Sequence, residues 1–233
     1  MRYIHLPLLL ALSLCAVSVH ADAFSCTSER SQQVDSDMVR AQTAYSKLTS
    51  LQARFLQESY LAALDTSETS TGMMWYERTG KMRWDYYQPE EQIFLLEDNT
   101  IRFYQVAEKQ VLVQSFSDVF LSDLPVAFLL GVGDLSKSFV LTKECQTPEG
   151  ILLFLSPQPK EAETADRELT SFELLVEPTN FEPLGARVRD VSGNTTKIVL
   201  SERQRNLPLP SSTFTLSYPP GTDVQDRREN APS

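Results

Sequence analysis

The sequence predicts a mainly β protein, an incomplete and unclosed antiparallel β-barrel covered by short helices. Three observations favour this fold class. Short segments with alternating apolar and polar residues recur along most of the chain, with turn residues between them. Helical periodicity occurs only near the start and the middle, which is unlike a βαβ fold. Finally, the aromatic-rich stretch from Gly72 to Tyr104 alternates in a way that indicates a concave apolar β surface.

The first 21 residues have the pattern of a secretory signal peptide. Arg2 supplies the positive start, Leu6 to Val19 the apolar run, and Val19-His20-Ala21 a small-residue cleavage pattern. A retained lipid anchor would need a Cys directly after the apolar run, whereas Cys15 lies inside it. No later segment approaches the roughly 18 consecutive apolar residues of a membrane span. We therefore expect a secreted and soluble mature protein.

We expect the mature chain to form one domain. The 233-residue chain loses 21 residues on cleavage and keeps about 210, a size that single barrels commonly reach. Residues 22–36 are polar and are expected to be a loose N-terminal segment. Residues 37–221 are expected to be the domain, and the polar residues 222–233 a disordered tail.

The charge of the mature chain argues against two classes of partner. Removing Arg2 with the signal peptide leaves 20 basic residues against 31 acidic ones, a net charge of −11. There is no long run of basic residues. Binding to nucleic acid and unaided docking on anionic lipid are therefore both disfavoured.

The mature chain contains no histidine, because His5 and His20 both lie in the signal peptide. Catalysis of the Ser-His-Asp or Cys-His kind and metal sites with histidine ligands are therefore excluded. The sequence also lacks a G-x-S-x-G elbow, a P-loop and the G-x-G-x-x-G motif. We expect no enzymatic activity, no cofactor and no metal. Hydrolysis by two carboxylates stays open, because Asp and Glu are plentiful.

Two cysteines, Cys26 and Cys145, remain after cleavage. An even number of cysteines in a secreted protein favours a disulfide, which would tie the N-terminal segment to the region after the middle helix. Two free thiols are the alternative. Redox catalysis is disfavoured because the pair does not have C-x-x-C spacing.

Helical periodicity predicts two helices. From Asp37 to Leu48 the apolar residues recur every three or four positions, as in an amphipathic helix of about three turns. From Pro125 to Phe139 apolar residues cover nearly every side, and a Pro suits the start of a helix. Such a helix must be buried or must cover something apolar, so we interpret it as a lid.

Alternation with period two predicts the strands. The expected strands span residues 51–57, 72–78, 82–86, 92–96, 101–106, 111–116, 139–142, 150–155, 169–176, 186–191, 195–200 and 213–218. Residues 60–71 are expected to be partly irregular. Hairpin turns are expected at residues 79–81 and at Asp98-Asn99, because Asp and Asn tolerate positive φ.

Position parity assigns the side chains of the aromatic-rich stretch to faces. Met74, Tyr76 and Arg78 share one face of their strand, and Met82 and Trp84 point inward from the next strand. Packing in the core is the simpler interpretation for the apolar residues among these. A strand Arg is usually solvated, so Arg78 is the unusual member of the group.

The same stretch resembles the periplasmic lipoprotein carriers of the LolA type. The matching positions, in the order and spacing of that family, are Gly72, Trp75, Arg78, Trp84, Gln88, Pro89 and Phe103-Tyr104. Weaker resemblance extends from about Leu48 to Val224 and so covers most of the secreted chain. The chain departs from the family pattern at Thr79, Met82, Asp98 and Arg102, where the family usually has Pro, Phe, Gly and often Trp. These departures bear on the shape of the site more than on the fold.

The resemblance implies a periplasmic carrier that holds the acyl chains of lipoproteins in an apolar cavity. Its implied partners are acylated lipoproteins, an inner-membrane ABC-type complex that releases them and an outer-membrane receptor that accepts them. The carrier itself is expected to be a monomer. In this family the matching arginine bonds backbone carbonyls of the helical lid, which implies control of the lid by Arg78. The implied ligand-binding residues are Phe55, Met74, Tyr76, Met82, Trp84, Phe128 and Leu129.

Two other functions remain open. One is a sensory or regulatory module on the same half-barrel that detects mislocalised lipoproteins or lipids. The other is a hydrolase that uses two carboxylates. Co-purification of acylated lipoprotein would separate carriage from hydrolysis, whereas a signalling partner would favour the sensor.

Overall fold

The computed structural model describes residues 22–30, 36–116, 135–158 and 169–228. Within these ranges a single sheet of 13 strands runs in the order β1-β8-β9-β10-β11-β12-β2-β3-β4-β5-β6-β7-β13. The strands are β1 Ser28–Glu29, β2 Ser50–Leu61, β3 Thr66–Glu77, β4 Lys81–Gln88, β5 Gln92–Glu97, β6 Thr100–Gln105, β7 Gln110–Ser115, β8 Phe139–Gln146, β9 Ile151–Pro157, β10 Leu169–Val176, β11 Pro183–Asp190, β12 Thr195–Arg205 and β13 Asp223–Asp226. The helical elements are α1 Ser36–Lys47, α3 Leu135–Ser138, and the 3₁₀ turns η1 Ala62–Leu64 and η5 Ser211–Phe214.

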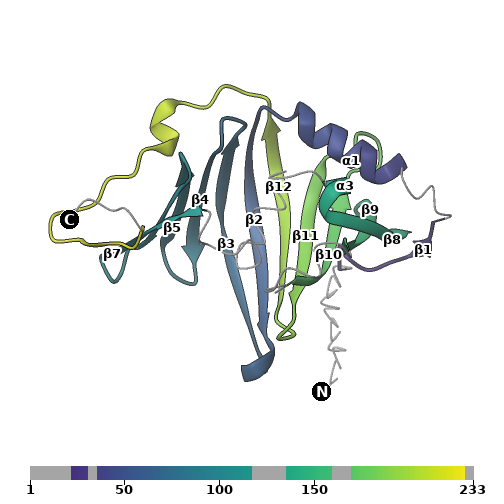
Figure 1. Ribbon diagram of the computed structural model, residues 1–233, viewed down its shortest axis with the longest axis horizontal. Coiled ribbons are helices and arrows are strands. Elements are labelled where there is room, and N and C mark those ends of the chain that lie inside the picture. The colour runs from purple at the N-terminus through teal and green to yellow at the C-terminus, as the bar shows by residue number, and fades with distance from the viewer. Residues whose placement is uncertain (1–21, 31–35, 117–134, 159–168, 229–233) are drawn as a thin grey trace, which may run out of the picture.

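The sheet is curved and does not close on itself (Figure 1). Neighbouring strands are antiparallel throughout, except that β13 pairs in parallel with β7. The two halves of the sheet, β8–β12 and β2–β7, join where β12 pairs with β2, from Thr195 opposite Tyr60 to Arg205 opposite Leu51. The predicted fold class, an unclosed and mainly antiparallel β structure with few helices, is confirmed.

Helix α1 packs its apolar stripe into the core. Met38, Ala41, Tyr45 and Leu48, the residues whose spacing predicts this helix, are at most 7% exposed. Asp37 in the first turn and Lys47 in the last have the charges that the helix dipole favours at those ends. The helix contacts α3, and Figure 1 shows the two together beside the β8–β12 half. None of the helices in the described ranges has the length and apolar character to cross a membrane.

Two hairpin turns form where the sequence predicts them. Asp98 and Asn99 have φ of 49° and 59° and join β5 to β6. Gly80 has φ of 90° in the turn between β3 and β4.

The hairpin between β2 and β3 is longer than the sequence suggests. Only residues 62–65 depart from the strands, as η1 and Asp65, because β2 and β3 pair from Ser50 opposite Glu77 to Leu61 opposite Thr66. The expectation of partly irregular structure holds for this turn and was wrong for residues 66–71. The Thr residues of β3 suit a strand, and residues 66–71 all pair with β2, whereas β4 pairs with β3 only from Thr71 onward.

The strand predicted at residues 213–218 is also wrong. The backbone forms η5 and then an irregular segment. The alternation that suggested a strand is real, since Leu216 and Tyr218 pack against a buried cluster of Tyr104, Val111 and Val113. Alternation reports which side chains are buried, but this segment lies on the outer face of the sheet and not along an edge. We call residues 206–222 the C-terminal strap.

The tail expected to be disordered begins with a strand. Residues 223–226 form β13 and pair with residues 110–113 of β7. The end of this tail, residues 229–233, lies outside the described residues. So do residues 125–134 of the helix expected at Pro125–Phe139.

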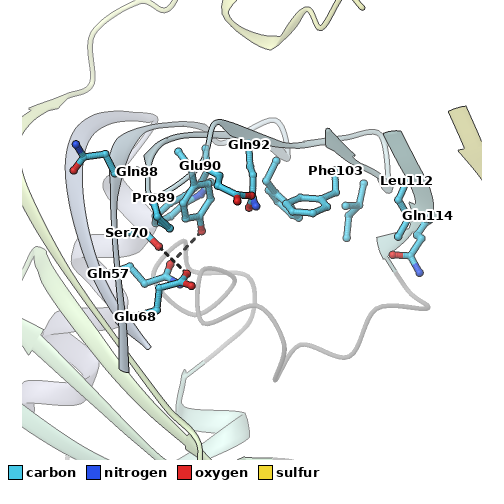
Figure 2. Close-up of a pocket in the computed structure, with 14 residues that line it drawn as sticks. Gln57, Glu68, Ser70, Gln88, Pro89, Glu90, Gln92, Phe103, Leu112 and Gln114 are labelled. Carbon is cyan, nitrogen blue, oxygen red and sulfur yellow. Dashed lines mark hydrogen bonds between the residues drawn. The ribbon is translucent and has the colours of Figure 1, made fainter. Parts of the chain in front are cut away.

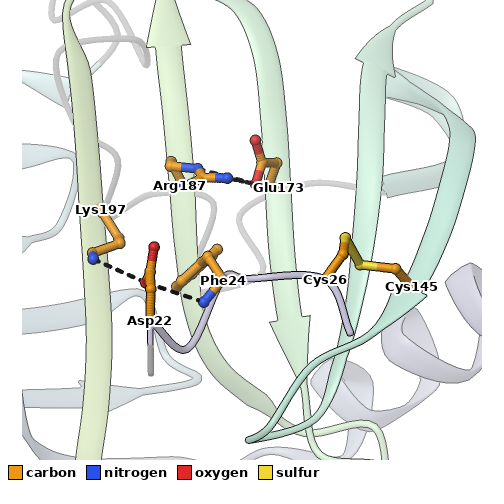
Figure 3. Close-up of polar contacts among 7 residues, drawn as sticks. All are labelled: Asp22, Phe24, Cys26, Cys145, Glu173, Arg187 and Lys197. Carbon is orange, nitrogen blue, oxygen red and sulfur yellow. Dashed lines mark hydrogen bonds and ion pairs between the residues drawn. A yellow bond between two sulfur atoms is a disulfide. The ribbon is translucent and has the colours of Figure 1, made fainter. Parts of the chain in front are cut away.

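Residues 22–30, the described part of the N-terminal segment, are tied down, where the sequence predicted a loose segment. Cys26 and Cys145 form a disulfide with an S–S distance of 2.02 Å, and Ser28–Glu29 pair with β8 beside it. Figure 3 shows the segment crossing the sheet, with Asp22 directed at Lys197 of β12. Phe24 is 3% exposed and packs on Leu152, Leu175 and Leu184. The disulfide is the one that the cysteine count favours.

Candidate functional site

The concave face of the β2–β7 half contains a pocket of about 520 Å³. Its floor is a row of apolar side chains in register across four strands. Trp84 of β4 lies opposite Phe94 of β5, Phe94 opposite Phe103 of β6, and Phe103 opposite Leu112 of β7. Side chains directly opposite each other share a face of the sheet, so the four form a continuous apolar strip.

An aromatic cluster forms one side of this pocket. The ring of Phe55 lies 4.6 Å from that of Trp84 and 4.9 Å from that of Tyr86, centroid to centroid. Gly72 makes this possible, because a Cβ at this position would lie 2.6 Å from the Phe55 ring and 2.0 Å from the backbone oxygen of Asp85. The Gly that opens the aromatic-rich stretch is therefore required by close packing.

Next to this cluster, the end of the pocket away from Phe103 and Leu112 is polar. Gln57, Glu68 and Ser70 come together there from β2 and β3, as Figure 2 shows. The Tyr86 hydroxyl donates a hydrogen bond to Oε1 of Gln57 over 3.1 Å, and burial raises the pKa of Tyr86. The site thus joins an apolar strip to a group of uncharged and acidic hydrogen-bonding side chains.

The sequence-predicted residues divide between pocket and core. Trp84 lines the pocket, and Phe55 packs directly behind it. Met74 and Met82 are 0% and 3% exposed and belong to the core cluster, without being part of the pocket lining. Tyr76 is half-buried and packs against the same cluster. Phe128 and Leu129 lie outside the described residues.

Arg78 lies at the C-terminal end of α1. Its Nε and Nη2 atoms donate to the backbone oxygen of Leu48 over 2.9 and 2.8 Å. Nη2 also bonds the backbone oxygen of Ser46 and lies 3.5 Å from that of Tyr45. The last carbonyls of a helix lack partners and carry partial negative charge, which a guanidinium complements. The helix bonded by Arg78 in the described ranges is α1, not the segment interpreted as a lid.

Comparison with known proteins identifies the family. The family model described as "Outer membrane lipoprotein carrier protein LolA" matches residues 46–217. The chain belongs to the LolA family. Two curated relatives, both named outer-membrane lipoprotein carrier protein, are each 32% identical to it. The one from Ralstonia nicotianae aligns over 77% of this chain and 82% of its own length, and the one from Cupriavidus pinatubonensis over 70% and 73%.

A solved structure supports the fold of this LolA-family chain. The crystal structure of an uncharacterized conserved protein from Thermus thermophilus aligns with a TM-score of 0.53, covering 82% of this chain and 97% of that one. Its sequence identity is 14%, so the likeness concerns the fold alone.

The pocket of this LolA-family chain includes residues that the sequence analysis did not select as ligand-binding. Among these are Phe94, Leu112 and Phe103, the last of which it named only as a position of the family motif. Parity within each strand was available as a signal, but it fixes a side chain only relative to its own strand. The register that aligns these three residues with Trp84 depends on strand pairing, which the sequence does not state.

Proposed function

We propose that this protein is a periplasmic carrier that binds the acyl chains of lipoproteins in the concave pocket and moves them between membranes. In this proposal it accepts cargo from an inner-membrane release complex and passes it to an outer-membrane receptor. The observation that carries the proposal is the apolar strip of Trp84, Phe94, Phe103 and Leu112 on the floor of the pocket, in a chain of the LolA family.

The energetics of the cargo explain why a carrier is needed. An acyl chain of about sixteen carbons exposes on the order of 12 kcal/mol of apolar surface to water, at about 0.8 kcal/mol per methylene. Such a chain does not cross an aqueous compartment unaided. An apolar strip on the concave side of a curved sheet shelters it without any catalytic group.

Arg78 has a part in this proposal through α1. The guanidinium holds the end of a helix whose apolar stripe lies in the same core cluster as Trp84 and Phe94. We propose that these bonds contribute to the closed, empty state, so that their recovery helps cargo to leave.

A pair of matched variants tests the pocket. Leu112→Glu places a carboxylate on the apolar strip, where it must be desolvated without a partner when acyl chains bind. Leu56→Glu places the same group on β2 at a position that is 40% exposed and outside the pocket lining. The readout is the amount of acylated lipoprotein that co-elutes with each folded variant, identified by mass spectrometry. We expect Leu112→Glu to reduce uptake at least tenfold and Leu56→Glu to leave it unchanged. Equal uptake by both variants would refute the pocket assignment.

A further inference from the structure

An apolar tip protrudes at the end of the sheet opposite α1. Figure 1 shows that the hairpin of β2 and β3 reaches further at this end than the β11–β12 turn beside it. At the apex of the hairpin Leu64 is 71%, Leu61 43% and Tyr60 37% exposed, and Val191 in the neighbouring turn is 62% exposed. We call these four residues the apolar tip. The other six exposed large apolar residues in the described ranges each lie on a different segment, so only here do such residues cluster.

Hydrogen bonds hold the apolar tip in shape. The Ala62 backbone N–H donates to Oδ1 of Asn194 over 3.0 Å, which joins the hairpin to the β11–β12 turn. The Tyr60 hydroxyl donates to Oδ1 of Asp65 over 3.0 Å, and Asp65 ends η1 with a φ of 48°. Turns usually consist of Gly, Asn, Asp, Ser and Pro, so the backbone does not require apolar side chains at this apex. A cluster of exposed apolar side chains indicates contact with another surface.

The size and shape of the apolar tip favour a lipid bilayer over a protein as that surface. A stable protein interface buries about 800 Å² on each partner and takes about 20 to 30 residues from each. Four side chains at the apex of a hairpin fall far short of this, and a protruding tip would need a partner with a matching hollow. A bilayer interface accommodates a small apolar tip without such a hollow, and a Tyr ring suits the boundary between headgroups and acyl chains.

The start of the described chain lies at the same end of the sheet. Oδ1 of Asp22 lies 3.2 Å from Nζ of Lys197, which lies 2.5 Å from Oε2 of Glu58. Glu58 comes three residues before Leu61, which is about 10 Å along an extended strand. The apolar run from Leu6 to Val19, which we expect to enter a membrane during export, joins the chain at Asp22. A precursor held in the membrane by this run therefore has the apolar tip near the bilayer.

The charges beside the apolar tip restrict the kind of bilayer. Residues 58–68 and 189–194 include four acidic side chains and one basic side chain, that of Arg189. Lys197, on the neighbouring strand, is already paired with Asp22 and Glu58. An anionic lipid surface repels such a group, whereas a zwitterionic surface does not.

We propose that the apolar tip inserts shallowly and reversibly into the interface of a zwitterionic bilayer. Gln57 lies three residues before Tyr60 and Glu68 four residues after Leu64, and both line the pocket. The docked protein therefore has one end of its pocket close to the bilayer. This inference goes beyond the proposed function, which assigns cargo to the pocket and does not say which surface of the carrier meets a membrane.

The first test measures binding of the mature protein to vesicles by flotation. The vesicles consist of phosphatidylcholine, alone or with about one-third phosphatidylglycerol. We expect the protein to float with the first kind and, at low salt, to float less with the second. Leu64→Asp should lower the partition coefficient at least about tenfold, because a charge replaces an apolar side chain that enters the bilayer. The control is Leu207→Asp, which alters a side chain that is 51% exposed beside Ser50, at the other end of β2, and should float like the unaltered protein.

The second test locates the contact. Cys26 and Cys145 are joined in the disulfide, so one added cysteine gives the mature protein a single free thiol for a polarity-sensitive dye. With phosphatidylcholine vesicles, the emission of the dye on Leu64→Cys should shift to shorter wavelength, and that of the dye on Leu207→Cys should stay unchanged. Flotation without a shift at residue 64, or an equal shift at both positions, would overturn the assignment to the apolar tip.

Failure of this proposal differs from failure of the carrier function. Leu112→Glu, which alters the pocket, should float like the unaltered protein. Absence of flotation by the unaltered protein, or flotation that Leu64→Asp does not weaken, would overturn membrane docking and leave uptake of lipoprotein unaffected. If Leu64→Asp then slowed the transfer of cargo, the apolar tip would contact a protein partner instead. Stronger flotation with the anionic vesicles would contradict the selection of zwitterionic lipid.

Discussion

At the scale of single residues, Arg78 has the most specific contacts of the matched motif residues. We expect Arg78→Leu to lower the free energy of unfolding by about 1 to 3 kcal/mol, because charged hydrogen bonds to the α1 carbonyls are lost. Amide hydrogen exchange near the C-terminal end of α1 should quicken. Arg78→Lys should restore only part of the loss, since an ammonium lacks the planar fork.

The proposed role of Arg78 in the closed, empty state of the carrier predicts how the same variant transfers cargo. Arg78→Leu should accept lipoprotein and transfer it to a receptor more slowly than the unaltered protein does. The control is Arg54→Leu, which removes an exposed arginine paired with Glu202 on β12. If Arg78→Leu transfers cargo at the unaltered rate, Arg78 has a structural role alone.

A buried pair of carboxylates lies where α1 meets β8. Glu144 and Asp37 are each 1% exposed, and Arg30 lies 3.1 Å from Asp37 Oδ2 and 3.6 Å from Glu144 Oε2. Burial, and then the negative charge of Asp37, raise the pKa of Glu144 above its ordinary value of 4.5. The folded state therefore binds the Glu144 proton more tightly than the unfolded state does.

The pH dependence that Glu144 causes has a definite sign. Below about pH 4.5 the residue is protonated in both states and costs nothing, and stability is lost as the pH rises through the folded-state pKa. Glu144→Gln should thus raise the midpoint of thermal unfolding at pH 7.5, and the gain should shrink toward zero near pH 4. The comparison is made by calorimetry across that range. If the increase in the unfolding midpoint were the same at every pH, ionisation of Glu144 would not lower the stability of the folded protein.

The sequence predicts the aromatic members of the site better than its polar members. Trp84 and Phe55 stand out because large aromatic residues with clear parity are conspicuous. Gln57, Glu68 and Ser70 have no such signal, since polar residues on a strand usually face water. Only the long pairing of β2 with β3 brings these three to one end of the pocket.

At the scale of elements, β13 and the C-terminal strap protect one edge of the sheet. Arg83 Nη1 donates to the backbone oxygens of Thr213 and Thr215 over 3.0 and 3.1 Å, and the rings of Tyr104 and Tyr218 lie 5.4 Å apart. These contacts bring the chain to β7, where β13 pairs in parallel. An unpaired edge strand is a template for association with another chain.

Removing β13 should therefore expose β7. We expect a chain ending at Gly221 to stay folded and to self-associate at concentrations where the full chain is monomeric, as measured by light scattering after size exclusion. Amides of Val111 and Val113 should lose protection from hydrogen exchange. A chain ending at Arg228 keeps β13 and is the control; association of both chains to the same degree would exclude the edge as the cause.

The elements that the sequence misplaces share a cause. The helix of residues 36–47 and the β5–β6 turn are local, because periodicity and positive φ are decided within a few residues. The regularity of residues 66–71 depends on pairing with residues 56–61, and the path of the strap at residues 206–222 depends on contacts such as that of Arg83 with Thr213, 130 residues apart. The alternation of apolar and polar residues can thus predict that a strand exists, but it does not predict which segment pairs with it.

At the scale of the whole molecule, the pairing of β12 with β2 joins the two halves into one sheet. We expect a single cooperative unfolding transition in urea, because the central strands bond to both halves. The two tryptophans, Trp75 and Trp84, lie in β3 and β4 and report on one half, whereas far-UV circular dichroism reports on both. The two curves should coincide. Separate midpoints would show that the halves unfold independently.

The pairing of β7 with β13 also fixes an order of events for a chain that appears N-terminus first. Strand β7 ends at Ser115, yet its partner ends at Asp226, 111 residues later. By then the residues of β8, with the disulfide partner of Cys26, have appeared, but within the described residues the strand that pairs with the outer edge of β7 comes last. Until residues 223–226 appear, the edge of β7 that faces away from β6 therefore lacks its partner strand and is open to association with other chains.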